Sequence, residues 1–315
     1  MPDIFLHVVC PVCSFADTGF VRKYHYRQSI FSGCSIVRCH NCKMVFVHPM
    51  PDEEVLDKYN AGYFSNAHGG ISTDKLTIAF HSAINLLRVI YVENFQQKHS
   101  IQIKNVLEIG PGGGHFARHW LNRCKKKTNY TGIESDTSCH DNLINSGVTV
   151  YAGIDQLPVD QNYDLVVISH VLEHTSNPVA FIANCTKLLS PGGILFIEVP
   201  CNDYEHKESD EPHLLFFDKG PMQLLFAKTG FDRIQVSYHG NTITDLKKIK
   251  PGHLGFMQRV RNVLLRKGII SPFSTKEPGL EGVDNPLERV VIKPFKAHIE
   301  QTEPAWWLRA IAIKK

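Results

Sequence analysis

A run of glycines after an apolar segment is the feature of this sequence best suited to binding a ligand. The segment VLEIGPGGGHFARHW places Glu108 at the end of an apolar run, followed by Gly110, Gly112 and Gly114 and then a helical pattern. Glycines let the backbone turn tightly and approach a ligand at the carboxyl edge of a sheet. About twenty residues later the next apolar run ends in Glu134, where a carboxylate can accept both ribose hydroxyls of a nucleoside. The joint spacing predicts a nucleoside cofactor.

Two cysteine pairs near the N-terminus have the spacing of metal ligands. Cys10 and Cys13 form one C-x-x-C pair, Cys39 and Cys42 form the second, and a β-like stretch separates them. This spacing lets four thiolates meet one tetrahedral Zn²⁺. A closed site of four thiolates has no open position for a substrate, so we expect a structural zinc. The nine cysteines are an odd number, which favours metal binding in a reducing compartment over a set of disulfides.

A third pattern, H-x-x-E-H, is formed by His170, Glu173 and His174 and matches one of the zinc-protease signatures. Its context argues against a catalytic metal, because the preceding DLVVIS is typical of a buried parallel strand rather than the middle of a helix. We expect His170 to face the cofactor and His174 to pack inside the protein.

Short apolar runs that alternate with helical stretches predict an α/β fold, with a parallel sheet covered by helices on both faces. The expected strands are NVLEIG, YTGIES, VTVYAG, DLVVISH, ILFIEVP, FDRIQVSYHG and WWLRAIAIKK. The expected organisation is a zinc ribbon at 1–50, a helical connection or lid at 51–100, a core at 101–240, an insertion over the active face at 241–303 and a last strand at 304–315.

The glycine run, Glu134, YDLVVISHVLEH and LLSPGGILFIEVP together resemble the class I S-adenosylmethionine-dependent methyltransferases. This resemblance implies a Rossmann-like sheet of seven strands, with the glycines at the methionine part of the cofactor and Glu134 at its ribose. Glu108 would organise the loop or meet the cofactor's amino group through water. Ile154 and Asp155 match the segment that holds adenine. A dehydrogenase reading is disfavoured, because its G-x-G-x-x-G fingerprint has the third glycine one residue later.

The segment CHNCKMVFVHPMP sharpens the resemblance toward methyltransferases with an N-terminal zinc-binding segment, which include nucleotide-sugar C-methyltransferases and relatives from polysaccharide and natural-product clusters. In these enzymes a run after the fifth strand supplies catalytic groups, and the matching stretch here is DEPHLLFF. His213 is therefore the first candidate for the catalytic base and Glu211 the second, while Tyr63 is a candidate for shaping the pocket. The expected acceptor is a hydroxyl, or a carbon, of a sugar or sugar-derived small molecule. The run SHVL after strand four lacks the Asn/Asp-Pro-Pro-Tyr of many N-methyltransferases.

Two other functional classes stay open. A ribosomal RNA methyltransferase would use the zinc ribbon to grip RNA, but a net charge of +3 and few interleaved arginines and aromatics disfavour nucleic acid. A non-catalytic scaffold would keep the fold but not bind S-adenosylmethionine. The sequence has no run of eighteen apolar residues and no signal-peptide pattern, so we expect a cytoplasmic protein without a membrane span. The oligomeric state is not encoded in any pattern that we identify.

Overall fold

The computed structural model describes residues 5–6, 8–62, 65, 70–123, 128–159, 161–248, 256–269, 297 and 299–315. Tyr63 and most of the predicted insertion between 249 and 298 lie outside the described residues.

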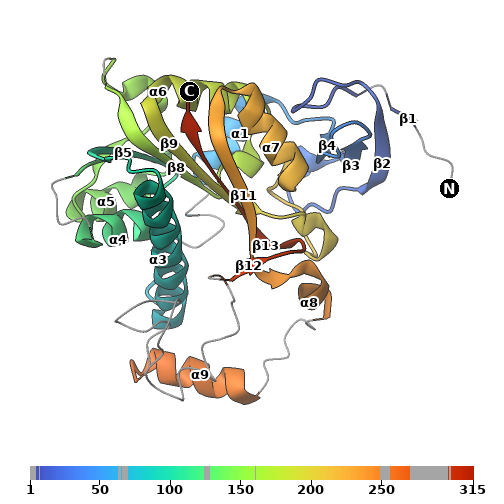
Figure 1. The fold of residues 1–315 in the computed structure, drawn as a ribbon. Helices are drawn as coiled ribbons and strands as arrows, with labels where there is room; N and C mark the ends of the chain where they lie inside the picture. Colours follow the sequence, from blue (N-terminus) through green and yellow to red (C-terminus); the bar gives the residue numbers. More distant parts are fainter. Residues whose placement is uncertain are drawn as a thin grey trace.

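A mostly parallel sheet forms the centre of the molecule (Figure 1). Its eight strands lie in the order β12 (Glu300–Gln301), β11 (Phe231–Thr242), β13 (Ala305–Lys314), β9 (Leu189–Pro200), β8 (Tyr163–Ser169), β5 (Asn105–Ile109), β6 (Asn129–Ile133) and β7 (Thr149–Tyr151). All seven predicted strands are present. The predicted count of seven is nevertheless one too low, because the two-residue β12 pairs with the outer edge of β11. The order reverses between β5 and β8, which makes their carboxyl ends the topological switch point where α/β sheets bind ligands.

Helices cover both faces of this sheet (Figure 1). One face packs against α3 (Lys75–Lys98), α4 (His115–Arg123) and α5 (His140–Asn145), and the other against α6 (Pro178–Leu188) and α7 (Lys219–Lys228). Strand residues alternate between the two cores: Val167 packs with the α3 and α4 side, while Val166 and Ile168 pack with the α6 and α7 side. This alternation explains why the central strands are apolar on both faces.

Helix α3 is a core helix of the domain. By length and composition it is apolar enough to cross a membrane, yet its inward face is buried against the sheet and α4 through Val89, Val92 and Phe95. Asp74 caps its start by accepting a hydrogen bond from the backbone N–H of Thr77, 3.0 Å away. Helix α3, which belongs to the segment predicted as a helical connection or lid, therefore contributes directly to the fold.

The N-terminal module, defined here as residues 8–50, contributes most of a second sheet. This antiparallel sheet has the order β1 (Phe5–Leu6), β2 (Thr18–Lys23), β3 (Ser35–Cys39), β4 (Val45–His48) and β10 (Leu215–Phe216). Strand β10 comes from the part of the chain that follows β9, the fifth predicted strand, and it pairs with β4. The module is thus completed by residues far along the sequence, and its apolar core is continuous with that of the α6 and α7 face.

The remaining described elements are short. They are α1 (Glu53–Asn60), α8 (Ile243–Lys248), α9 (Phe256–Arg266), and the 3-10 turns η1 (Ser29–Phe31), η2 (Thr137–Cys139), η3 (Ile154–Gln156), η4 (Leu172–His174) and η5 (Asp203–Glu205). Of the predicted insertion, α8, α9 and β12 are described, and its predicted position over the active face stays a prediction.

Candidate active site

The glycine loop turns between β5 and α4 at the switch point of the sheet. Gly110, Gly112 and Gly114 have φ angles of 72°, 48° and 69°, in the left-handed region that favours glycine. At Gly110 a Cβ atom would also lie 2.5 Å from Cγ2 of Val171. The backbone of this loop is therefore shaped by packing against the segment that follows β8.

Glu134 lies at the end of β6, where the sequence predicts it. Its Oε2 accepts a hydrogen bond from the backbone N–H of Gly112 at 2.9 Å, and its Oε1 accepts one from that of Asp136 at 2.9 Å. Burial raises the pKa of Glu134 although these donors oppose the shift. Each carboxylate oxygen has two acceptor sites, so one site on each remains available for a ribose hydroxyl.

Glu108 is buried below the loop rather than open to it. Its Oε2 accepts a 2.6 Å hydrogen bond from the hydroxyl of Tyr130, and only 3% of the residue is exposed. Burial raises the pKa of Glu108 to about 7, because the hydrogen bond from Tyr130 only partly compensates the desolvation. Of the two predicted roles, organising the loop is the one this position favours.

The predicted adenine segment forms η3 after β7. Ile154 is 46% exposed there, and Asp155 follows it at the surface. An exposed apolar side chain at the carboxyl edge of the sheet is suited to packing against a planar base. Contact of Ile154 and Asp155 with adenine stays a prediction.

His170 follows β8 in a left-handed conformation, with φ of 57°. Its Nδ1 lies 3.3 Å from Oε1 of Glu173 and its Nε2 lies 3.6 Å from Oε1 of Glu198. Burial opposes protonation, but these two carboxylates outweigh it and raise the pKa of His170. Two arginines, Arg88 and Arg309, bind Glu198 with donor distances of 2.8 Å and 2.6 Å and hold its pKa well below the usual range.

His213 lies in the 203–213 loop, which links β9 to β10. Its Nδ1 is 2.7 Å from Oδ2 of Asp203, and 7% of the residue is exposed. An ionised carboxylate can only accept, so Nδ1 donates this hydrogen bond and Nε2 is the ring nitrogen turned away from Asp203. Nε2 points toward Oε1 of Glu173, 4.0 Å away. The structure thus brings His213 to the H-x-x-E-H segment, a convergence that the sequence spacing did not predict.

Both carboxylate oxygens of Glu211, the second candidate for the catalytic base, accept hydrogen bonds from the N-terminal module and α1. Its Oε2 accepts hydrogen bonds from the backbone N–H groups of Arg27 and Gln28 at 2.6 Å and 3.0 Å, and its Oε1 accepts one from the hydroxyl of Tyr59 at 3.1 Å. These contacts tether the 203–213 loop to the N-terminal module and α1.

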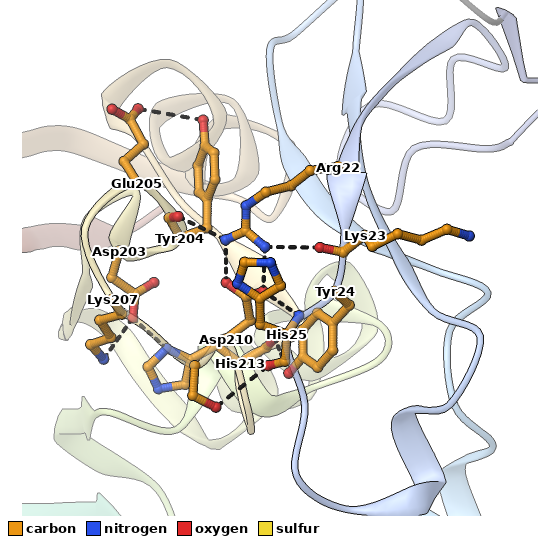
Figure 2. A network of polar contacts seen from close by, with 11 residues as sticks. Arg22, Lys23, Tyr24, His25, Asp203, Tyr204, Glu205, Lys207, Asp210 and His213 are labelled. Atoms are coloured by element: carbon orange, nitrogen blue, oxygen red, sulfur yellow. Dashed lines mark hydrogen bonds and ion pairs between the residues drawn. The ribbon is translucent and has the colours of Figure 1, made fainter.

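The N-terminal module also binds the 203–213 loop through Arg22 and Tyr24 (Figure 2). Arg22 donates to both carboxylate oxygens of Asp210 at 2.6 Å and to the carbonyl of Tyr204 at 2.8 Å. The hydroxyl of Tyr24 donates to the carbonyl oxygen of His213 at 3.0 Å. The module therefore positions the backbone that carries His213.

The four predicted zinc ligands converge. Sγ of Cys10 lies 3.5 Å from Sγ of Cys42, and Sγ of Cys13 lies 3.5 Å from that of Cys39. All four sulfur atoms lie within 4.8 Å of one another. Sulfur atoms around a tetrahedral Zn²⁺ lie about 3.8 Å apart, given a Zn–S distance of about 2.3 Å. The donor set and spacing fit a structural zinc.

Several site residues lay outside the sequence predictions. Asp203 orients His213 across ten positions of irregular chain, a separation with no periodic signal. Glu198 carried a signal, because it is the one acidic residue in the apolar run ILFIEVP. Asp136, which binds the backbone N–H and hydroxyl of Ser65 at 2.8 Å and 2.7 Å, follows Glu134 too closely for the spacing rule to separate the two.

Comparison with known proteins finds matches for the central part of the chain. Residues 85–236 match the family model described as "Methyltransferase domain". A ubiquinone biosynthesis O-methyltransferase of Nitrosospira multiformis is 26% identical over 185 residues, which cover 56% of this chain and 68% of that protein. The protein of the same name from Pseudomonas aeruginosa is 28% identical over 185 residues, covering 56% and 70%.

Among solved structures, those of methyltransferases have limited similarity to this chain. The plantazolicin methyltransferase BamL, in complex with a triazolic desmethylPZN analogue and S-adenosylhomocysteine, has a TM-score of 0.49 and 16% identity, covering 83% of this chain and 98% of that one. A methyltransferase of Thermotoga maritima, described as a possible histamine N-methyltransferase, has a TM-score of 0.44 and 17% identity, covering 73% and 91%.

Proposed function

We propose that this enzyme, whose methyltransferase domain uses S-adenosylmethionine, methylates a hydroxyl group of a small molecule. The observation that carries the proposal is the buried pair of Asp203 and His213, which directs a ring nitrogen toward Glu173 in the segment that follows β8. The names of the curated relatives, which are O-methyltransferases, support a hydroxyl acceptor.

Methyl transfer from a sulfonium is an in-line displacement, so the protein mainly orients the acceptor and removes its proton. S-adenosylmethionine would lie along the glycine loop, with its ribose at Glu134, its adenine beside Ile154 and Asp155, and its reactive end toward His170. His213 is placed to receive the acceptor proton on Nε2, because Asp203 stabilises the imidazolium that forms. Glu211 then acts as a positioning residue that fixes the loop.

We further propose a sugar or sugar-derived acceptor, which rests on the resemblance of the N-terminal segment to sugar methyltransferases. A phenolic acceptor is the second candidate, since the curated relatives act in ubiquinone biosynthesis by name. RNA is less well supported, because two arginines of the ribbon, Arg22 and Arg38, are already engaged by Asp210 and by the hydroxyl of Tyr204. We also propose that the four cysteines hold a structural zinc, which would fix the module that grips the acceptor side.

The test is transfer of a labelled methyl group from S-adenosylmethionine to a panel of nucleotide sugars and phenols, with wild type and His213→Gln. General base catalysis contributes about 10²- to 10⁴-fold, so we expect at least a 100-fold loss of kcat with an unchanged Kd for S-adenosylmethionine. His206→Gln is the matched control, because His206 lies in the same loop but outside the pair. A His213→Gln enzyme within threefold of wild type would refute the role of His213.

A further inference from the structure

A buried carboxylate beside the cofactor loop lacks the hydrogen bonds that such a group needs. Glu173 lies in η4, immediately after β8, and is 0% exposed. Within the described part of the chain, neither of its carboxylate oxygens accepts a hydrogen bond. A buried charge is strongly unfavourable unless it is paired, hydrogen-bonded or bound to a metal. His170, whose Nδ1 lies 3.3 Å from Oε1, is its nearest ionisable partner, and a carboxylate that accepts no hydrogen bond has acceptor sites left for a cation.

Three imidazole rings surround this carboxylate. Besides His170, whose Nδ1 is 3.3 Å from Oε1 of Glu173, the Nε2 atoms of His174 and His213 each lie 4.0 Å from that oxygen. The rings of His174 and His213 meet edge to face, with centroids 5.1 Å apart. One ligand atom from each of Glu173, His174 and His213 lies within 4.8 Å of the others. Ligand atoms of a tetrahedral zinc site lie about 3.4 Å apart, so small side-chain rotations would close the three around one ion.

The surroundings also orient one of these ligands. Asp203 accepts the Nδ1 proton of His213 at 2.7 Å, and Lys207 donates to the same Asp203 oxygen at 2.6 Å. A carboxylate on the far nitrogen of a metal-binding histidine fixes its tautomer and increases its basicity. The backbone adds a constraint, because the N–H of Leu214 donates to the carbonyl of Glu173 at 2.8 Å.

The third ligand, His213, lies outside the H-x-x-E-H motif. The H-x-x-E-H pattern alone gives no metal site here, because it does not lie on one helix: His170 follows the end of β8, while Glu173 and His174 lie on the 3-10 turn η4. The 203–213 loop brings His213 to this turn from another part of the chain. Val171, between His170 and Leu172, contacts the glycine loop at Gly110, so the group lies beside the predicted cofactor site.

We propose that Glu173, His174 and His213 bind one divalent transition-metal ion at the acceptor side of the cofactor site. Two imidazoles and one carboxylate suit zinc, cobalt, manganese or iron(II), and three protein ligands leave positions open for a substrate oxygen. This inference deepens the proposed function and rests on it for its chemical role, although binding of the ion itself does not.

The ion changes how the acceptor loses its proton. Coordination to a divalent cation lowers the pKa of a bound hydroxyl. The O–H bond then breaks and the proton leaves to water. A lone pair of the oxygen forms the new O–C bond with the methyl group, while the C–S bond breaks and its electrons stay on sulfur as the neutral thioether. In the loaded enzyme His213 acts as a ligand, and it receives a proton directly only in the metal-free protein.

The test is titration of the protein with Co²⁺ after its cysteine site has been filled with zinc. We expect one equivalent of cobalt with visible absorption and without the thiolate charge-transfer band of a cysteine site. Glu173→Gln and His174→Gln should abolish this binding, and Glu205→Gln, an exposed acid in the next 3-10 turn, should retain it. S-adenosylmethionine titration of each variant shows that it is folded. Failure of wild type to bind this cobalt, or binding retained in Glu173→Gln, would overturn the proposal.

A second measurement separates this proposal from the proposed function. Enzyme treated with a chelator until only the cysteine-bound zinc remains should lose methyl transfer at least 100-fold and recover it with Co²⁺ or Mn²⁺, at constant affinity for S-adenosylmethionine. Full activity of the treated enzyme would overturn the metal proposal and leave His213 as the direct base. Loss of S-adenosylmethionine binding in zinc-loaded wild type would instead overturn the proposed function.

Discussion

The pair formed by Arg22 and Asp210 should connect the N-terminal module to the loop that carries His213. The Asp210 side chain is 0% exposed and the Arg22 side chain 26% exposed, with both N–O distances at 2.6 Å. In Arg22→Met the one remaining donor to this buried carboxylate, among the residues that the structure describes, is the backbone N–H of His25, 2.7 Å away. Removing one partner of a fully buried pair costs about 3–5 kcal/mol. The partial exposure of Arg22 reduces the expected cost to about 2–3 kcal/mol.

The assay is chemical denaturation in the presence of zinc, combined with methyl-transfer kinetics. We expect Arg22→Met to lower the free energy of unfolding and kcat, with no change in the Kd for S-adenosylmethionine, because Arg22 contacts the 203–213 loop and not the glycine loop. Lys23→Met, at the exposed neighbouring position, is the matched control. The double variant Arg22→Met/Asp210→Asn should lose less free energy of unfolding than the two single variants lose together, because the two side chains interact. A change below about 0.5 kcal/mol in Arg22→Met, which is typical of surface positions, would refute this account of the module.

Three further outcomes follow from the site. The folded pKa of Glu108, about 7, exceeds its unfolded value near 4.5, so the stability that this group contributes is full below pH 4.5 and is lost as the pH rises toward 7. The free energy of unfolding of Glu108→Gln, relative to that of wild type, should therefore increase between pH 5 and pH 8, by up to about 3 kcal/mol. A difference between the two proteins that does not change with pH would contradict this. Gly110→Ala should weaken S-adenosylmethionine binding at least about tenfold in calorimetry, because a φ of 72° costs about 1–2 kcal/mol for alanine and its Cβ would displace Val171; unchanged affinity would argue against the loop as the cofactor site. Cys39→Ser should abolish the zinc measured by metal analysis and lower the unfolding temperature, whereas Cys185→Ser, buried in α6, should keep the zinc; equal zinc in both would contradict the four-thiolate site.

The sequence predicted the central sheet well because its strands are defined by local composition. DLVVIS and ILFIEVP are continuous apolar runs, and both form buried strands of the parallel sheet. The positions of the loop glycines and of Glu134 could also be predicted from the sequence, since each lies directly after such a run. The four cysteines were found by their spacing, although metal binding itself stays a prediction.

Contacts between segments far apart in the sequence could not be predicted from local patterns. Strand β10 completes the sheet of the N-terminal module, and no local pattern links Leu215 to Phe46, its partner in β4. The meeting of Glu173 with His213 depends on the path of the 203–213 loop, which Arg22 and Asp210 fix by an ion pair between distant parts of the chain. Irregular backbone held by side chains gives no periodic signal, so this half of the site needed the structure.

The most direct test of the central claim is calorimetric titration of zinc-loaded protein with S-adenosylmethionine and S-adenosylhomocysteine, comparing wild type, Glu134→Ala and Asp141→Ala. Hydrogen bonds from two hydroxyls to one charged carboxylate contribute about 3 kcal/mol together, so Glu134→Ala should bind about 100-fold more weakly. Asp141 is an exposed acid in α5, and its variant should bind as wild type does. Equal binding by all three proteins would contradict the role of Glu134, and the absence of binding by folded wild type would contradict the account as a whole.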